Sequence, residues 1–107
     1  MKKVSIVSPV YNEEESLRAF YVSLISAFEG LPYTFELIFV NDGSSDGSER
    51  ILNSLADEDG RILAIHLSRN FGHQAALSAG LAAASGDYII SLDSDGQHPP
   101  RLIPEMI

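Results

Sequence analysis

Four short stretches of the chain are almost continuously apolar and rich in β-branched or aromatic side chains. Runs of this length and character predict strands that are covered on both faces, as in a parallel sheet. The predicted strands span residues 4–10, 35–40, 62–67 and 88–92. Each run ends abruptly in polar or turn-forming residues, so we expect polar loops to begin where the strands end.

The stretch between the first two predicted strands has the periodicity of a helix. From Leu17 to Phe28, large apolar residues recur at spacings of three and four, which predicts an amphipathic helix. Asn12 and Glu15 have the spacing of a capping box. We therefore expect this helix to begin next to Asn12, with acidic residues in its first turn, where they complement the helix dipole.

Two further helices are predicted between the later strands. Asp46 and Glu49 repeat the capping-box spacing ahead of the second helix. The third helix covers residues 74–85 and is rich in alanine, and its small side chains together with Gly80 would let it approach a sheet closely. Gly86 has the position of a glycine that ends such a helix as its C′ residue.

Strands and helices therefore alternate along the chain, with connections of a few residues. This alternation predicts a three-layer α/β fold with a mainly parallel sheet and right-handed crossovers. Ligands of such sheets bind beyond the carboxyl ends of the strands, near the point where the strand order reverses. The unusual polar residues of this chain all follow predicted strands: Pro9 to Glu13, Asn41 to Gly43, Ser68 to Asn70, and Asp93 with Asp95.

The last of these groups is an Asp-Ser-Asp sequence that directly follows the fourth predicted strand. If the extended conformation continues, the side chains of Asp93 and Asp95 project to the same side, about 6–7 Å apart. Two carboxylates so placed suit Mg²⁺ or Mn²⁺, which prefer oxygen ligands and keep positions open for phosphate. Their mutual repulsion in water is only about 1 kcal/mol or less, so an ordinary solvated loop is an open alternative.

Composition narrows the classes of function. The chain has 107 residues, a formal net charge of −8 and no cysteine. The acidic charge argues against nucleic acid as the main partner, and the lack of cysteine excludes disulfides and thiolate metal sites from this sequence. No apolar run approaches the ~18 residues of a membrane span. Because an apolar, helix-like pattern is still developing at Ile107, we expect the N-terminal part of a longer, unexported protein.

Several candidate residues have both a structural and a functional interpretation. Asp42 begins a loop rich in glycine and serine, which is either a plain turn or a place where a carboxylate faces a base or a sugar. Glu13 is either a helix-dipole acid or a ligand, and Arg69 is either solvated or a partner for phosphate. The three histidines lack the spacing of a metal site, and His66, inside a predicted strand, is interpreted as structural.

The sequence contains no Walker loop, dinucleotide-binding glycine motif or serine nucleophile elbow. Two classes of enzyme remain. In nucleotide-sugar transfer, a metal bound by Asp93 and Asp95 would neutralise a diphosphate leaving group. In phosphotransfer of the haloacid-dehalogenase kind, the paired aspartates usually follow the first strand, whereas here they follow the fourth. A non-catalytic nucleotide-sugar-binding piece is a third alternative.

Several segments resemble a known family. Ser8-Pro-Val-Tyr-Asn-Glu-Glu14, Val40-Asn-Asp-Gly-Ser-Ser-Asp-Gly47 and the DXD motif Asp93-Ser-Asp95 resemble glycosyltransferase family 2, which has the Rossmann-like GT-A fold. Leu67-Ser-Arg-Asn-Phe-Gly72 and Gln97-His-Pro-Pro100 resemble the branch of dolichol-phosphate mannose synthases and bacterial undecaprenyl-phosphate sugar transferases. The resemblance covers the whole chain, and it implies that residues 1–107 are the N-terminal, donor-binding portion of a catalytic domain.

The resemblance implies a role for each matching residue. Pro9, Tyr11 and Glu13 would line the nucleotide pocket, Asp42 would hydrogen-bond the base, and Arg69 would lie near the phosphates. Asp93 and Asp95 would hold Mg²⁺ or Mn²⁺ against the diphosphate of the nucleotide-sugar, and Gln97 would complete the metal shell.

The resemblance also implies a reaction. It is the inverting transfer of a hexose from a UDP- or GDP-sugar to a polyprenyl phosphate, as in the synthesis of cell-envelope glycans. We expect no general base, because a phosphate acceptor is already nucleophilic. The chain alone is expected to bind the sugar donor weakly or not at all and to be inactive. We expect a cytoplasmic protein whose full-length form lies at the cytoplasmic face of the membrane, attached through a later part. An open sheet edge would also invite pairing with a second copy.

Overall fold

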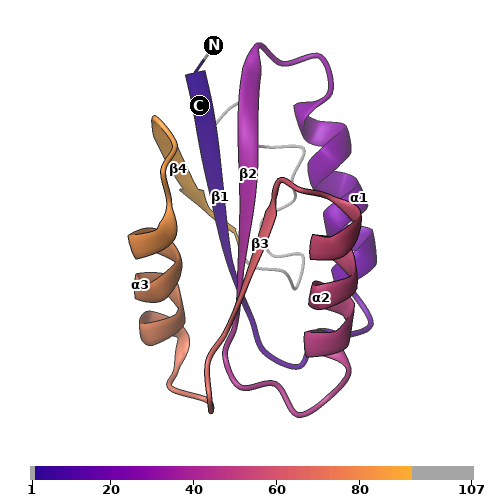
Figure 1. Ribbon diagram of the computed structural model, residues 1–107, viewed down its shortest axis with the longest axis vertical. Coiled ribbons are helices and arrows are strands. Elements are labelled where there is room, and N and C mark those ends of the chain that lie inside the picture. Colours follow the sequence, from indigo (N-terminus) through magenta and orange to yellow (C-terminus); the bar gives the residue numbers. More distant parts are fainter. Residues whose placement is uncertain (1, 93–107) are drawn as a thin grey trace.

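The computed structural model describes residues 2–92, which form a parallel sheet between two helical layers (Figure 1). The strand order across the sheet is β3-β2-β1-β4, and each neighbouring pair is parallel. The strands are β1 (Lys2–Val10), β2 (Tyr33–Asn41), β3 (Ile62–His66) and β4 (Tyr88–Ser91). The predicted three-layer α/β fold with a parallel sheet is therefore confirmed.

The helices connect successive strands and cover both faces of the sheet. They are α1 (Leu17–Phe28), α2 (Ser48–Glu58) and α3 (His73–Ala83). Figure 1 shows α1 and α2 together on one face and α3 alone on the other. β1 is central because the chain first adds β2 and β3 on one side of it and later adds β4 on the other.

The larger core lies between the sheet and the pair α1–α2. Alternate residues of β1, such as Val4 and Ile6, point into this core and are buried almost completely. The apolar stripe of α1 packs on them, and the ring of Phe20 meets that of Phe39 edge-on, with 6.3 Å between ring centroids. The helical periodicity of the sequence therefore corresponds to one buried face, as predicted.

The smaller core lies between the sheet and α3. Val7 and Val40 face Ala76 and Gly80 of that helix, and all four residues are buried. A side chain at Gly80 would collide with Val7 and would lie 3.1 Å from Val40. The expectation that Gly80 and small side chains allow a close approach is confirmed.

The first helix begins later than the capping pattern predicts. α1 starts at Leu17 after Ser16, its first turn contains no acidic residue, and Asn12 lies outside it in a left-handed conformation with φ of 51°. The predicted capping box of Asn12 and Glu15 is therefore wrong. Its physical reason is that the side chain of Asn12 accepts hydrogen bonds from another loop, between β2 and α2.

The predicted capping box of Asp46 and Glu49 is also wrong. α2 has Gly47 as its N-cap with no side-chain cap, and Asp46 lies before it and accepts from the backbone N–H of Ser48, two residues on, at 2.9 Å. Glu49 instead extends toward β3, where its carboxylate lies 3.8 Å from Nδ1 of His66.

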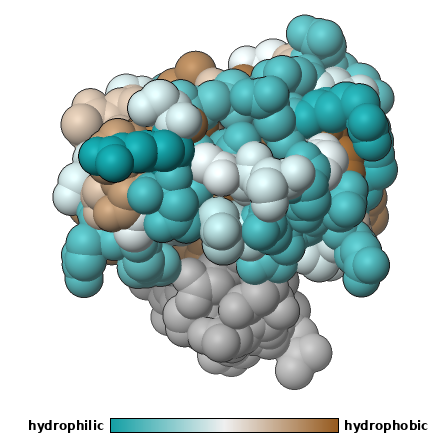
Figure 2. All heavy atoms as spheres, turned by 90° about the horizontal axis from the view of Figure 1, so that it is seen from below, coloured by the Kyte–Doolittle hydropathy of each residue, from teal (hydrophilic) through white to brown (hydrophobic). Residues whose placement is uncertain are grey.

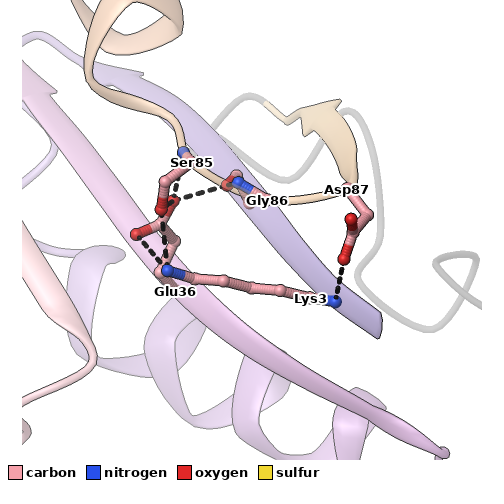
Figure 3. A network of polar contacts seen from close by, with 6 residues as sticks. Lys3, Glu36, Ser85, Gly86 and Asp87 are labelled. Carbon is pink, nitrogen blue, oxygen red and sulfur yellow. Dashed lines mark hydrogen bonds and ion pairs between the residues drawn. The ribbon is translucent and has the colours of Figure 1, made fainter. Parts of the chain in front are cut away.

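The start of β4 is held by a polar cluster at the amino ends of the strands (Figure 3). Glu36 of β2 accepts hydrogen bonds from Ser5 and from the backbone and hydroxyl of Ser85, and it forms an ion pair with Lys3 at 3.2 Å. Gly86 donates its N–H to the Ser5 hydroxyl at 2.8 Å. We call these five residues the Glu36 cluster. It ties the end of the third crossover to both central strands.

Gly86 therefore has a different role from the predicted one. α3 ends at Ala83 with Ala84 as its extended C-cap, so Gly86 is not the C′ residue of the helix. A Cβ at Gly86 would lie 2.6 Å from the Ser5 hydroxyl and 2.7 Å from the Ser5 backbone nitrogen. Glycine is needed here because the chain passes directly against β1.

Candidate functional site

Three loops meet at the carboxyl ends of the strands. The β1–α1, β2–α2 and β3–α3 connections lie together at the lower end of the molecule in Figure 1. Figure 2 views the molecule from this side, and the described surface there is largely hydrophilic. For the three predicted groups of polar residues that lie within residues 2–92, the position at one edge of a parallel sheet is the observed one.

Asn12 joins the first loop to the second. Its backbone N–H donates to the Ser44 hydroxyl at 3.0 Å, and its side-chain oxygen accepts from the N–H groups of Ser45 at 2.8 Å and Asp46 at 3.3 Å. The left-handed backbone of Asn12 suits this residue type, which tolerates positive φ better than most. The contacts hold Tyr11 and Glu13, the neighbours of Asn12, beside the β2–α2 loop.

The acidic residues after Asn12 extend this contact. Glu13 donates its backbone N–H to the Ser48 hydroxyl at 3.0 Å. Glu14 donates its N–H to Asp46 at 3.2 Å and accepts from the N–H of Gly47 at 3.0 Å. Desolvation raises the pKa of Asp46, but hydrogen bonds from Ser48 and Glu14 outweigh it and lower that pKa overall. The two loops are thus joined reciprocally, through backbone groups on both sides.

A cavity of about 340 Å³ opens beside this joint. It is lined by residues of both loops: Asn12, Glu13, Glu14, Glu15, Ser16 and Asp46. Four of these side chains are carboxylic acids. Such a lining favours hydroxyl and amine groups, which donate hydrogen bonds, over an uncompensated phosphate.

Asp42 joins the second loop to the third. It is almost completely buried, and its carboxylate accepts hydrogen bonds from the backbone N–H groups of Phe71 at 2.8 Å and Gly72 at 3.1 Å. Its own N–H donates to the carbonyl of Val10 at 2.8 Å. A carboxylate has about four acceptor positions, so the two bonds leave capacity for a further hydrogen-bond donor.

Gly43 allows the second and third loops to approach each other closely. Its φ of +70° is left-handed, and a side chain on it would fall within the backbone of Arg69 and Asn70. The guanidinium of Arg69 in turn lies over the ring of Phe71, 4.6 Å from the ring centroid. A cation–π contact of this kind restrains an exposed arginine at the rim of the three loops.

The structure thus brings together the predicted residues Tyr11, Glu13, Asp42 and Arg69 on loops that contact one another, with Pro9 near the end of β1. Sequence reasoning missed the joining role of Asn12 and the pairing of Asp42 with the third loop. A polar residue that tolerates positive φ directly after a strand is a local signal for the first. The second depends on residues far apart in the chain.

The predicted metal ligands Asp93, Asp95 and Gln97 lie outside the described residues. The structure does describe how the chain approaches them. β4 pairs with β1, and the N–H of the buried Leu92 donates to the carbonyl of Val7 at 3.0 Å. β4 therefore runs toward the edge where the loops meet, beside the β1–β4 boundary at which the strand order reverses.

Two carboxylates and one amide oxygen would form a hard oxygen donor set, which is the chemistry that Mg²⁺ and Mn²⁺ require. The predicted ligands therefore fit the expected metal in kind. Within residues 2–92, no cluster of three or more histidine or acidic side chains has the arrangement of a metal site. Nor does any helix of that range have the length and apolar character needed to cross a bilayer.

Comparison with curated proteins reveals close relatives. The chain is 46% identical over 105 residues to a bactoprenol glucosyl transferase of Shigella phage SfV, covering 98% of this chain and 34% of the relative. It is 49% identical over 108 residues to the undecaprenyl-phosphate 4-deoxy-4-formamido-L-arabinose transferase of Yersinia pestis (strain Pestoides F), covering 100% of this chain and 33% of the relative. The chain thus spans about a third of the length of these relatives.

Solved structures share the fold. The mannosyltransferase PcManGT from Pyrobaculum calidifontis, in complex with GDP-Man and Mn²⁺, superposes with a TM-score of 0.78 at 22% identity, over 94% of this chain and 30% of the other. S. aureus TarS 1–349, in complex with UDP-GlcNAc, gives a TM-score of 0.70 at 24% identity, over 87% of this chain and 26% of the other. The predicted GT-A fold, limited to its N-terminal part, is confirmed.

The sequence of the chain also matches a family model. The model described as glycosyl transferase family 2 matches residues 5–107, which is nearly the entire chain. The match includes all three loops of the site and the predicted metal ligands. The resemblance seen in the sequence motifs is thereby confirmed, and the chain belongs to glycosyl transferase family 2.

Proposed function

We propose that residues 1–107 are the donor-binding portion of a glycosyltransferase that moves a hexose from a nucleotide-diphospho-sugar to a polyprenyl phosphate. The observation that carries this proposal is the meeting of three polar loops at the carboxyl edge of the parallel sheet in a family 2 chain. The names of the relatives support the acceptor, since one acts on bactoprenol and another on undecaprenyl phosphate.

The nucleotide of the sugar donor is proposed to lie against the loop residues. Asp42 has acceptor capacity left for a donor group of the base, and its burial would make such a bond selective. Pro9, Tyr11 and Glu13 are proposed to line the nucleotide pocket, and Arg69, on the third loop, is proposed to lie near the phosphates. The structural neighbours support UDP- and GDP-sugars as the donor class, because one holds UDP-GlcNAc and another GDP-Man.

Asp93, Asp95 and Gln97 are proposed to hold Mg²⁺ or Mn²⁺. When bound, the cation would supply charge stabilisation to the diphosphate leaving group. A neighbour that contains Mn²⁺ supports this assignment. The acidic cavity near Glu13 gives a further reason, since a diphosphate beside these carboxylates needs a compensating positive charge.

The transfer is proposed to invert the anomeric carbon. An oxygen of the acceptor phosphate attacks that carbon as the bond to the nucleotide diphosphate breaks on the opposite side. The acceptor oxygen is already ionised near neutral pH, so no side chain of this chain is needed to remove a proton. The protein residues act by binding and orienting the two reactants.

A haloacid-dehalogenase-like phosphotransferase loses its support, because the family match covers the whole proposed site. A binding role without catalysis is tested below. The acceptor is a lipid, so we also propose that the full-length protein works at the cytoplasmic face of a membrane, with further chain making the attachment.

The test is calorimetric titration of UDP-glucose and GDP-mannose into this chain, with and without Mn²⁺. We expect metal-dependent binding of one nucleotide-sugar, and its loss in Asp95→Ala. The matched control is Asp57→Ala, which removes the same charge from an exposed position near the far end of α2. Equal binding by Asp95→Ala and wild type would contradict the metal assignment. Binding without transfer by any longer form would favour a non-catalytic role.

A further inference from the structure

A hydrogen-bonded chain links the end of β3 to the proposed nucleotide loops. Asn41 and His66 end β2 and β3 and are paired in register. The buried side chain of Asn41 makes contacts in two directions. Its oxygen accepts from the backbone N–H of Ser44 at 3.0 Å, and its nitrogen lies 3.1 Å from Nδ1 of His66.

These contacts fit one hydrogen-bonding form of the His66 ring. The Asn41 oxygen is occupied by a backbone N–H, so the Asn41 NH₂ group faces the histidine and can only donate. Nδ1 of His66 must then accept, which requires a neutral ring with its proton on Nε2. The side-chain oxygen of Asn53, 2.8 Å from Nε2, accepts the hydrogen bond that this N–H donates. Every partner is satisfied only by the neutral imidazole.

The β2–α2 loop, which Asn41 holds through Ser44, also contacts the β1–α1 loop at the proposed site. The backbone N–H of Ser44 donates to the side-chain oxygen of Asn41. The hydroxyl of Ser44 accepts a hydrogen bond from the backbone N–H of Asn12. Asp42 lies between Asn41 and Ser44 in the sequence. Displacement of the Asn41 amide would therefore remove a restraint on the nucleotide loop and, through Ser44, weaken its contact with the loop that carries Tyr11.

We propose that His66 is a positioning residue of the sugar-donor site, which as a neutral ring orients Asn41 and thereby holds the Asp42–Ser44 turn. The inference rests on the proposed function for its link to the sugar donor. The bracing of the turn rests on the contacts alone. His66 touches none of the reacting groups and acts through Asn41.

The arrangement makes the turn sensitive to pH. The elements packed on β3 are α2 and β2. α2 presents Glu49, whose carboxylate is 3.8 Å from Nδ1, together with Asn53, and β2 presents the neutral Asn41. With a proton on Nδ1, the ring would place an N–H group against the NH₂ of Asn41, and the two donors could not bond. The carboxylate of Glu49 would attract the protonated ring. The Asn41 amide then loses its partner, and Ser44 loses its acceptor.

The first experiment follows the Ser44 amide in the 107-residue chain by NMR. Its protection factor against hydrogen exchange is measured from about pH 8 to about pH 5, a range that spans ordinary histidine titration. We expect the protection to fall about five- to tenfold as His66 becomes protonated, which is the effect of losing one hydrogen bond. An unprotected Ser44 amide at the upper pH, or protection that ignores the protonation of His66, would overturn the proposal.

Two variants separate positioning from packing. His66→Asn places an amide oxygen near the position of Nδ1 and cannot titrate, so we expect Ser44 to stay protected throughout. His66→Leu removes the acceptor, so we expect weak protection at every pH. His73→Asn is the matched control, because this exposed histidine opens α3 and is not a member of the hydrogen-bonded chain from His66 through Asn41 to Ser44, so the wild-type profile should be unchanged. If His66→Leu does not fold, His66→Asn still decides the question.

The second experiment measures the dissociation constants of UDP and GDP with Mn²⁺ over the same pH range. For the nucleotide that binds, we expect the dissociation constant of the wild type to rise about five- to tenfold toward low pH. We expect a much smaller rise in His66→Asn. If neither nucleotide binds while Ser44 follows His66, the proposed function fails and the bracing of the turn stands. If a nucleotide binds equally in both proteins at every pH, the positioning role fails and the proposed function stands.

Discussion

At the scale of single residues, Gly43 occupies a position that excludes every other amino acid. Its backbone is left-handed, and a Cβ would fall within the backbone of Arg69 and Asn70. We predict that Gly43→Ala lowers the free energy of unfolding by about 3 kcal/mol, since left-handed strain and a backbone clash add. Urea denaturation measures this loss as a lower midpoint.

Two other glycines separate the two causes. Gly30 has a φ of +82°, but a Cβ added to it would meet open space, so Gly30→Ala should cost only the conformational strain, about 1 kcal/mol. Gly60 has open space and no positive φ, so Gly60→Ala should be nearly neutral. A Gly43→Ala loss no larger than that of Gly30→Ala would show that the two loops can separate without cost.

Glu36 gives the second prediction at this scale. Desolvation raises its pKa, but hydrogen bonds from Ser5, Ser85 and Lys3 outweigh it and lower the pKa from 4.5 to about 2 (Figure 3). A carboxyl whose folded pKa is depressed stabilises the fold above its unfolded pKa and loses that contribution as the pH falls. We predict that Glu36 contributes about 2 kcal/mol near neutral pH, lost between about pH 5 and pH 2.

The comparison with Glu36→Gln isolates this contribution. Hydrogen bonding by the Arg61 guanidinium also holds the pKa of Asp59 well below its usual range, so acid destabilises the wild type through more than one group. The gap in unfolding free energy between wild type and Glu36→Gln should be widest near neutral pH and should close toward about pH 2. A gap of constant size over this range would show that the charge of Glu36 is not responsible.

At the scale of elements, α3 packs closely on the sheet because Gly80 has no side chain. We predict that Gly80→Val lowers the unfolding free energy by about 2 kcal/mol, because the new side chain overlaps Val7 and Val40. Ala82→Val introduces the same β-branched residue on the exposed face of the helix and should cost only a few tenths of that value. Thermal denaturation of the two variants would measure the difference, and equal losses would contradict the packing argument.

The elements also show what a sequence can reveal. The strands were predictable because each is an apolar run, and the sheet edge that holds the site followed from their parallel order. The start of α1 was not predictable, because Asn12 bonds to Ser45 rather than to its own helix. The pairing of Asp42 with Phe71 has no local signal either, since the two are brought together only by the β2–β3 crossover.

At the scale of the whole molecule, the structure describes a sheet with one loop cluster and no second lobe within residues 2–92. We predict that this chain binds its nucleotide-sugar weakly and transfers no sugar to a polyprenyl phosphate. Radiolabelled transfer by this chain and by a longer form that includes the following residues would test this. Turnover by the 107-residue chain alone would show that the donor-binding portion is sufficient for catalysis.

The central position of β1 also has a consequence for synthesis on the ribosome. The first strand to leave the exit tunnel has its neighbours much later in the chain, since Val4 pairs with Phe35 on one side and with Tyr88 on the other. Its backbone N–H and C=O groups on the β4 side stay unpaired until almost all of the described residues have emerged. Translation speed and chaperone access during that interval should therefore influence the yield of folded protein more than the strength of any single contact.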